Sequence, residues 1–264
     1  MSPHEPDAHV PAGRAGIVSP QPAWRIVPLG DRCLIVEFES RVAEEINRRA
    51  RALAHRLLAQ GLPGVVDVVP AFCTVAVYYR PERFGPGAAP YQQLRLQVEA
   101  VLRAGPESAE APAREVRVPV CYGGEYGPDL DEVAQTCGMT PAEAVLAHAA
   151  SDHVVFMLGF SPGFPYIGGL DPRLSVPRRP TPRTRIPAGT VAIARDQSAI
   201  YSFETPGGWN LIGRTPMSLF DPLADPPCRL QAGDRIRFVP ILPDEFASSA
   251  VSGHAVSGPA SSGT

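Results

Sequence analysis

The chain has 264 residues, of which 44% are hydrophobic and 19% charged, and its 24 basic residues nearly balance 27 acidic ones, giving a net charge of −3. This length predicts one or two domains with packed cores, and so small a charge excludes a strongly basic nucleic-acid-binding domain. Every basic residue is an arginine. Without lysine the chain can form neither a P-loop, whose lysine reaches the β- and γ-phosphates, nor a Schiff base.

The cysteines and the apolar runs indicate a soluble protein. The five cysteines are odd in number, widely spaced and without a C-x-x-C pair, which argues against a disulfide framework or a zinc site. Residues 1–22 lack the apolar block of a secretory signal, and the longest uncharged stretch, 154–170, is interrupted by prolines and glycines. We therefore expect a cytoplasmic protein that binds no metal, no nucleic acid and no membrane.

The first half of the chain alternates strand-like and helix-like segments. Residues 1–23 and 244–264 lack apolar periodicity, so we predict disordered tails there. The apolar residues of 42–57 recur every three or four positions, with Ser40 as a candidate N-cap and Gly61 as the stop. The expected strands are 33–38, 64–69, 72–79 and 116–120, and the expected helices are 42–57 and 91–103. This β-α-β-β-α-β order predicts a small ferredoxin-like, split-βαβ domain over residues 24–121.

Residues 122–243 have a different pattern. Asp129 is placed to cap a short helix that ends at Gly138, and Thr140 with Glu143 has the spacing of a capping box for a second helix. Short strands are predicted at 154–158, 190–194, 200–203, 209–212 and 235–241, with turn sequences between them. Their regular spacing favours a β-barrel or a sandwich, so the whole chain is expected to be of the α+β class.

Two motifs in this region have weak chemical interpretations. Residues 159–163 fit the G-x-S-x-G pattern, but Pro162 follows the serine and cannot supply the backbone N–H of an oxyanion hole, and the sequence after it is typical of turns. His148 and His153 are five residues apart, so on a helix their side chains would diverge, which disfavours a shared metal. A lone histidine such as His148 is more often a hydrogen-bonded core group than a catalyst.

Polar residues suited to ligand binding lie further along. Four arginines crowd into residues 178–185 among prolines, and such forked donors suit carboxylates and phosphates, although a solvated basic loop is equally compatible with the pattern. Gln197, Tyr201, Trp209, Asn210 and Arg214 lie in or beside predicted strands. A barrel mouth could gather them into an aromatic-walled pocket, or Tyr201 and Trp209 could simply belong to the core.

Several sequence blocks carry a family resemblance. They are VFMLGFSPGFPYIGGL at 155–170, PRR at 177–179, PRTRIPAG at 182–189 and PGGWNLIGRT at 206–215, together with His148, Gln197 and Tyr201. This set resembles the allophanate-hydrolase-subunit-1 family over residues 30–243. The resemblance implies a cyclophilin-like β-barrel domain over 122–243, which follows the smaller α/β domain in the sequence.

The family also implies a function. Its bacterial members include the B component of an ATP-dependent 5-oxoprolinase, which works with subunits A and C to open 5-oxoproline to L-glutamate, and a KipI-like inhibitor that blocks autophosphorylation of a sensor histidine kinase. The first alternative makes this chain part of a hydrolase, inactive alone, in a hetero-oligomer that binds ATP.

The resemblance implies roles for six residues as well. His148 would support the site or relay a proton, while Arg185 or Arg214 would hold a carboxylate or phosphate. Gln197 and Tyr201 would bind the lactam, and Trp209 would form a wall.

Overall fold

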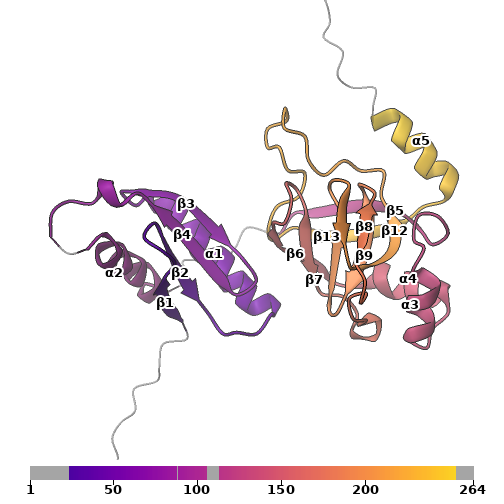
Figure 1. The fold of residues 1–264 in the computed structure, drawn as a ribbon, viewed down its shortest axis with the longest axis horizontal. Coiled ribbons are helices and arrows are strands. Elements are labelled where there is room, and N and C mark those ends of the chain that lie inside the picture. The colour runs from indigo at the N-terminus through magenta and orange to yellow at the C-terminus, as the bar shows by residue number, and fades with distance from the viewer. Residues whose placement is uncertain (1–23, 88, 106–112, 254–264) are drawn as a thin grey trace, which may run out of the picture.

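The structure is a computed structural model that describes residues 24–87, 89–105 and 113–253, with side chains to residue 249. Figure 1 shows two lobes, an N-terminal α/β lobe and a barrel lobe. In the described part of the chain, no helix combines the length and apolarity needed to cross a bilayer. The predicted tail at 1–23 lies outside the described residues.

The N-terminal lobe is an antiparallel sheet with its two α-helices packed on one face. The strand order is β1-β2-β4-β3. The strands are β1 (Arg25–Pro28), β2 (Cys33–Glu37), β3 (Val65–Pro70) and β4 (Thr74–Tyr79), and the helices are α1 (Glu44–Gln60), the single turn η1 (Pro81–Arg83) and α2 (Pro90–Arg103). Alternate strand residues such as Leu34, Val36 and Val75 pack against apolar residues of α1 and α2 to form this lobe's core.

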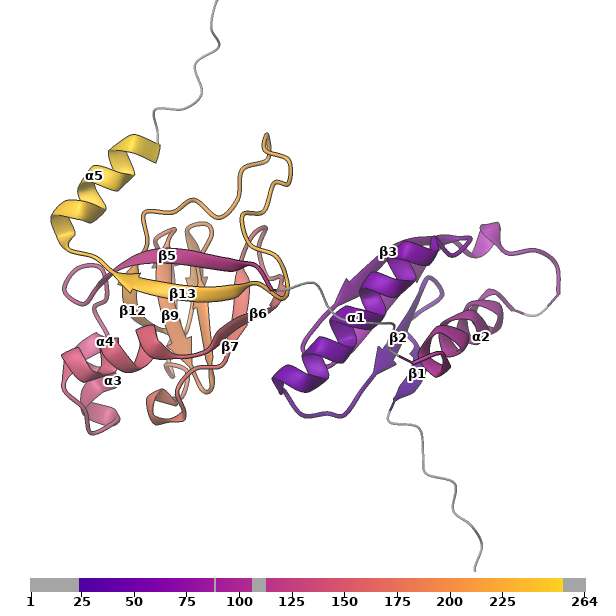
Figure 2. The same cartoon turned by 180° about the vertical axis from the view of Figure 1, so that it is seen from behind.

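The second lobe is a closed barrel, seen from behind in Figure 2. Its strand order is β10-β7-β6-β13-β5-β12-β9. The strands are β5 (Glu115–Tyr122), β6 (His153–Leu158), β7 (Pro165–Gly168), β9 (Thr190–Ala194), β10 (Gln197–Ile200), β12 (Asn210–Arg214) and β13 (Arg235–Pro240), and a short ladder of β8 (Arg183–Ile186) and β11 (Thr205–Gly207) accompanies them. The remaining elements are α3 (Leu130–Thr136), α4 (Pro141–Ala150), η2 (Pro172–Leu174) and α5 (Pro243–Gly253).

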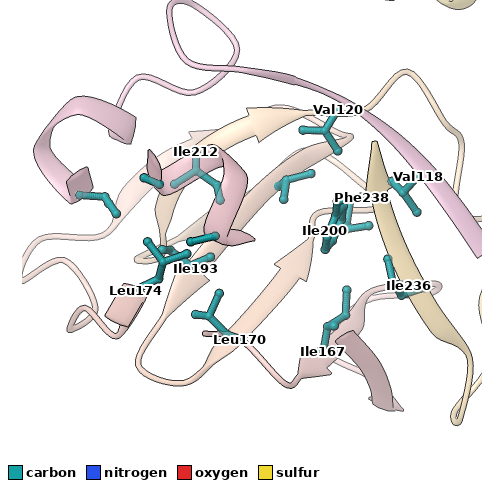
Figure 3. Close-up of a cluster of buried hydrophobic side chains, with 14 of the residues drawn as sticks. Val118, Val120, Ile167, Leu170, Leu174, Ile193, Ile200, Ile212, Ile236 and Phe238 are labelled. Carbon is teal, nitrogen blue, oxygen red and sulfur yellow. The ribbon is translucent and has the colours of Figure 1, made fainter. Parts of the chain in front are cut away.

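Branched and aromatic residues from distant parts of the chain fill the barrel lobe's core. Figure 3 shows Val118 and Val120 of β5 beside Phe238 and Ile236 of β13, facing Ile200 and other labelled side chains. The helix pair α3–α4 contributes further residues, and the start of α4 is fixed by the predicted capping box. Glu143 N donates to Thr140 Oγ1 at 3.3 Å, and Thr140 N donates to Glu143 Oε2 at 2.8 Å.

The ferredoxin-like arrangement is not confirmed, because its predicted closing strand lies elsewhere. Residues 115–122 form β5, which pairs in parallel with β13 and antiparallel with β12 inside the barrel. The sheet edge beside β2 is taken by β1 instead, through a local hairpin whose Gly30 has a positive φ. A hairpin closes over few residues, so it costs less chain entropy than a distant strand would. The barrel therefore begins at 115, before the predicted boundary at 121.

Several other predicted helices, strands and segments differ from the structure in their bounds or type. Helix α1 begins at Glu44 after Ala43 rather than at a Ser40 cap, although Gly61 ends it in the left-handed conformation as expected. Residues 164–169, predicted as turn, contain strand β7. The predicted tail at 244–264 begins with α5, and residues 254–264 lie outside the described part of the chain.

The two lobes contact each other through α1 and the β3–β4 turn. The buried Asn47 points its Nδ2 at three carbonyl oxygens, those of Ala71 at 2.9 Å and Phe72 at 3.3 Å in its own lobe and that of Phe156 at 3.0 Å in the barrel. The Phe72 ring lies edge-on to Phe156 and Tyr166 of the barrel, at centroid distances of 6.3 and 5.5 Å.

Candidate substrate-binding site

An aromatic cluster covers the outer face of the barrel beside the turn at 207–209. Phe164 lies 5.1 Å from Tyr166 and 5.2 Å from Tyr201 between ring centroids, and Tyr166 lies 6.2 Å from Trp209. Beneath these rings the strands carry small residues, Ala192, Ala194 and Ala199, which leave room for them. Tyr201 and Trp209 are 2% and 5% exposed, so both belong largely to this packed cluster.

The turn that precedes Trp209 is fitted to Tyr201. A Cβ added to Gly207 would overlap the phenol oxygen of Tyr201, so this position requires glycine. Burial raises the pKa of Tyr201 to about 12, and a hydrogen bond with the Trp209 backbone opposes that rise. Tyr201 is thus a neutral phenol at physiological pH, available as a hydrogen-bonding group but not as a base.

The arginine-rich loop lies against the same turn. Arg179 N donates to Gly208 O at 2.8 Å, and the Arg178 guanidinium lies over the Trp209 ring, 5.5 Å from its centroid. Such a cation–π contact is worth about 0.5–1 kcal/mol at an exposed site. The predicted wall residue, Trp209, therefore has an arginine as its immediate neighbour.

A buried carboxylate fixes this loop from below. Asp129 accepts hydrogen bonds from Arg179 Nη1 at 3.1 Å, from Arg183 Nη1 and Nη2 at 2.9 and 2.7 Å, and from Leu211 N at 2.7 Å. Arg179 Nη1 also donates to Glu132 at 2.9 Å. Asp129 precedes α3 as predicted, but its side chain makes no helix-capping bond. Instead it links the start of α3, the arginine loop and β12.

A cavity of about 220 Å³ opens between α3, this loop and the start of β12. Its lining residues are Glu132, Val133, Thr136, Val176, Pro177, Arg178, Arg179, Pro180 and Asn210. Asn210 Nδ2 donates to Pro177 O at 2.9 Å and to Ile193 O at 3.2 Å, which holds the loop against the barrel. The cavity combines apolar walls with guanidinium and amide groups, the usual composition of a small-molecule site.

None of the six predicted site residues lines this cavity. Arg185 of β8 is 76% exposed at its side chain and pairs with Glu204 at 2.7 Å. Gln197 is half-buried at the first position of β10, opposite Ala194. Arg214 ends β12, roughly 13 Å along the strand from Asn210. There its Nε donates to Ala188 O at 2.8 Å and its guanidinium lies over Phe246 of α5.

His148 lies within the barrel lobe's core. It is fully buried, with Nδ1 2.8 Å from the Tyr122 hydroxyl and Nε2 3.1 Å from Ser198 Oγ. His153 Nε2 donates to His148 O at 2.8 Å, and both rings pack on Phe238. Burial, with a smaller contribution from the neighbouring histidine, holds the pKa of His148 well below its usual value.

The six predicted residues therefore occupy separate places. Tyr201 and Trp209 are neighbours, whereas His148 is in the core and Arg214 is beside α5. Their functional roles stay predictions. The sequence does not indicate that Asp129 binds both the arginine loop and β12, because its partners there are 50 to 82 residues away. In the described residues, no three His, Cys, Asp or Glu side chains gather as a metal site would require.

Comparisons with known proteins identify the class. Residues 24–230 match the family described as carboxyltransferase domain, subdomain C and D, and the chain belongs to this family. The chain is 40% identical to the B component of 5-oxoprolinase from Bacillus subtilis (strain 168), over 84% of this chain and 95% of that protein. It is 41% identical to the corresponding B component from Escherichia coli O157:H7, over 80% and 94%.

A solved structure, that of TTHA0988, shares the fold and much of the sequence. It is 38% identical with a TM-score of 0.69, over 80% of this chain. The matched part makes up only 40% of the TTHA0988 chain, which is therefore much longer than the matched region.

Proposed function

We propose that this chain is the B component of an ATP-dependent 5-oxoprolinase that opens 5-oxo-L-proline to L-glutamate together with subunits A and C. The observation that carries the proposal is the similarity to proteins named as this component of 5-oxoprolinase, which extends over nearly their whole length at about 40% identity. The longer TTHA0988 chain supports a setting in which this unit operates with further polypeptide.

The reaction has chemical requirements that one small polypeptide does not meet. A γ-lactam resists hydrolysis, so the proposed route transfers a phosphoryl group from ATP to the amide oxygen before water attacks the activated carbon. The chain has no lysine and no P-loop to grip ATP. In the proposed enzyme, the assembled complex therefore binds ATP, while the barrel of this chain binds the small substrate.

Reconstitution tests the proposal. This chain is purified, mixed with subunits A and C, and assayed for ADP release with and without 5-oxo-L-proline. We expect no turnover from the chain alone and 5-oxoproline-dependent ATP hydrolysis from the full set. A full set that stays inactive with this chain, but is active when a homologous B component replaces it, would refute the proposal.

A further inference from the structure

We propose that the cavity beside Trp209 binds a small molecule carrying both a carboxylate and an amide N–H, with Arg178 holding the carboxylate and Asn210 accepting the N–H. This inference rests on the proposed function and specifies its substrate site, because 5-oxo-L-proline carries both groups. The two side chains come from segments 32 residues apart and line the same cavity.

Arg178 is the cation available at this site. Its three neighbours in the arginine-rich loop are already committed, Arg179 and Arg183 to Asp129 and Arg185 to Glu204. Among the described residues, no carboxylate lies within ion-pair distance of Arg178. Its guanidinium lies over the Trp209 ring and the residue lines the cavity, and a planar guanidinium fork suits a bidentate carboxylate.

Asn210 supplies the complementary acceptor. Its Nδ2 donates to two carbonyl oxygens, which fixes the orientation of the amide. Within the described part of the chain, no hydrogen bond to its Oδ1 is formed, although the residue is only 7% exposed. An amide oxygen without a hydrogen-bond partner, on a residue that lines the cavity, is suited to accept an N–H from a ligand, and it would repel a second carboxylate.

Four of the remaining lining residues are apolar, and the one carboxylate among them, Glu132, is paired with Arg179. Val133, Val176, Pro177 and Pro180 present apolar surface that suits ring methylene groups. The volume, about 220 Å³, is below the range of roughly 300–1,000 Å³ typical of sites for drug-sized ligands, so it favours a small metabolite.

Hydrogen bonds within the protein hold the loop of this site in position. The loop that carries Arg178 is held at Gly208 O by the Arg179 backbone, at Asp129 by the Arg179 side chain and at Asn210 by Pro177 O. Such preorganisation lowers the entropy lost when a ligand binds. Asp129 is therefore a positioning residue for the site rather than a group that touches the ligand.

Ligand binding to the full-length chain tests the site directly. We would titrate 5-oxo-L-proline, N-methyl-5-oxoproline and 2-pyrrolidinone, which lacks the carboxylate, and follow the heat of binding. We expect saturable binding of 5-oxo-L-proline and affinities at least tenfold weaker for the other two. Arg178→Gln should weaken 5-oxo-L-proline binding at least tenfold, and Arg178→Lys should restore part of the loss. Arg237→Gln, which removes an exposed arginine of β13, is the matched control and should change nothing.

Three results of the binding experiment would overturn the site assignment. They are the absence of saturable 5-oxo-L-proline binding, unchanged affinity in Arg178→Gln, and competition by inorganic phosphate at equal concentration, which would indicate a general oxyanion site. In the reconstituted complex, Arg178→Gln should raise KM for 5-oxo-L-proline at least tenfold with kcat within about threefold of the unmodified value. An active complex whose KM does not change in Arg178→Gln refutes the site and keeps the function. The function is refuted and the site is kept if the unmodified chain binds 5-oxo-L-proline normally but its complex is inactive, while a homologous B component makes the complex active.

Discussion

Gly207 shows how one missing methyl group supports the aromatic cluster. The Tyr201 phenol occupies the space that a Cβ at residue 207 would fill, and Ile186 Cδ1 would lie 2.9 Å from that Cβ. We predict that Gly207→Ala lowers the free energy of unfolding by about 1–3 kcal/mol, the usual cost of overpacking. Urea unfolding measures this loss.

A double-mutant cycle identifies the cause of that loss. Tyr201→Phe removes the phenol oxygen, which relieves the worst overlap but also forfeits the hydrogen bond with the Trp209 backbone. The two substitutions together should therefore destabilise by less than the sum of their separate effects. Strict additivity would show that Gly207 is required for some reason other than Tyr201.

At the scale of elements, the arginine loop depends on Asp129. We predict that Asp129→Asn loosens this loop, because two arginines lose their shared carboxylate while Leu211 N keeps only an amide oxygen. Breaking a fully buried ion pair costs about 3–5 kcal/mol, and the partial exposure of both arginines reduces the expected loss to about 2 kcal/mol. Limited trypsin digestion should cut the Arg178–Arg179 bond several times faster in the variant.

Asp131→Asn provides the control for that experiment. Asp131 lies in the first turn of α3 and is exposed, so the substitution removes the same charge from the same helix without touching the loop. Its digestion rate should match that of the unmodified chain. If Asp129→Asn were digested no faster than Asp131→Asn, Gly208 and Asn210 alone would suffice to hold the loop.

Sequence signals between neighbouring residues predict individual helices and strands, whereas the pairing of strands and side chains distant in the sequence is seen only in the structure. The capping box at Thr140 and Glu143, and strand β9 over residues 190–194, follow from neighbouring residues alone and are confirmed. The alternating valines of β5 indicate a strand with one buried face, but they do not indicate which strands pair with β5. The sequence prediction therefore places β5 in the N-terminal sheet, whereas it belongs to the barrel. The expectation that Asp129 caps α3 fails for the same reason, since its real partners have no fixed spacing in the sequence.

The candidate site, too, is only partly predictable from the sequence. The sequence indicates Trp209, Asn210 and the arginine-rich loop as groups suited to ligands, and the structure places Arg178 over Trp209 and Asn210 in the same cavity. The sequence alone does not separate the arginines already neutralised by acidic side chains from Arg178. That distinction depends on Asp129, Glu132 and Glu204, which approach the loop only in the folded chain.

For the whole molecule, two buried histidines make stability depend on pH. Burial lowers the pKa of His153 to about 4 and holds the pKa of His148 well below its usual value. Each is neutral when folded but has a pKa near 6.5 when unfolded, so the unfolded state binds more protons as the pH falls below about 6.5. Stability should be full above that pH and fall by up to about 1.4 kcal/mol per pH unit per histidine until the folded pKa is reached.

Urea unfolding between pH 7.5 and 5 measures this dependence. In His153→Gln, the free energy of unfolding should fall less steeply with decreasing pH, because this histidine no longer contributes. His55→Gln, at an exposed position of α1, should leave this pH dependence unchanged. An unmodified chain equally stable at both pH values would mean that these histidines remain able to gain protons without unfolding.

The junction between the lobes determines whether the molecule unfolds as one unit. The two lobes have separate hydrophobic cores, and Asn47 is a buried polar group that bonds to both of them. We predict that Asn47→Ala uncouples the lobes, because the Phe156 carbonyl loses its donor and the β3–β4 turn that carries Phe72 loses its anchor. An unsatisfied buried polar group costs about 1–3 kcal/mol, enough to expose a difference in stability between the lobes.

The two tryptophans report on the two lobes separately, since Trp24 packs against the N-terminal core and Trp209 against the barrel. In Trp24→Phe and Trp209→Phe backgrounds, the remaining tryptophan follows one lobe during urea unfolding. The two curves should coincide for the unmodified junction and separate for Asn47→Ala, while Arg48→Ala, at an exposed position one residue along α1, should leave them coincident. Coincident curves in Asn47→Ala would assign the coupling to the contacts that remain between the lobes, which include those of Phe72 with Phe156 and Tyr166 and the ion pair of Glu44 with Arg235.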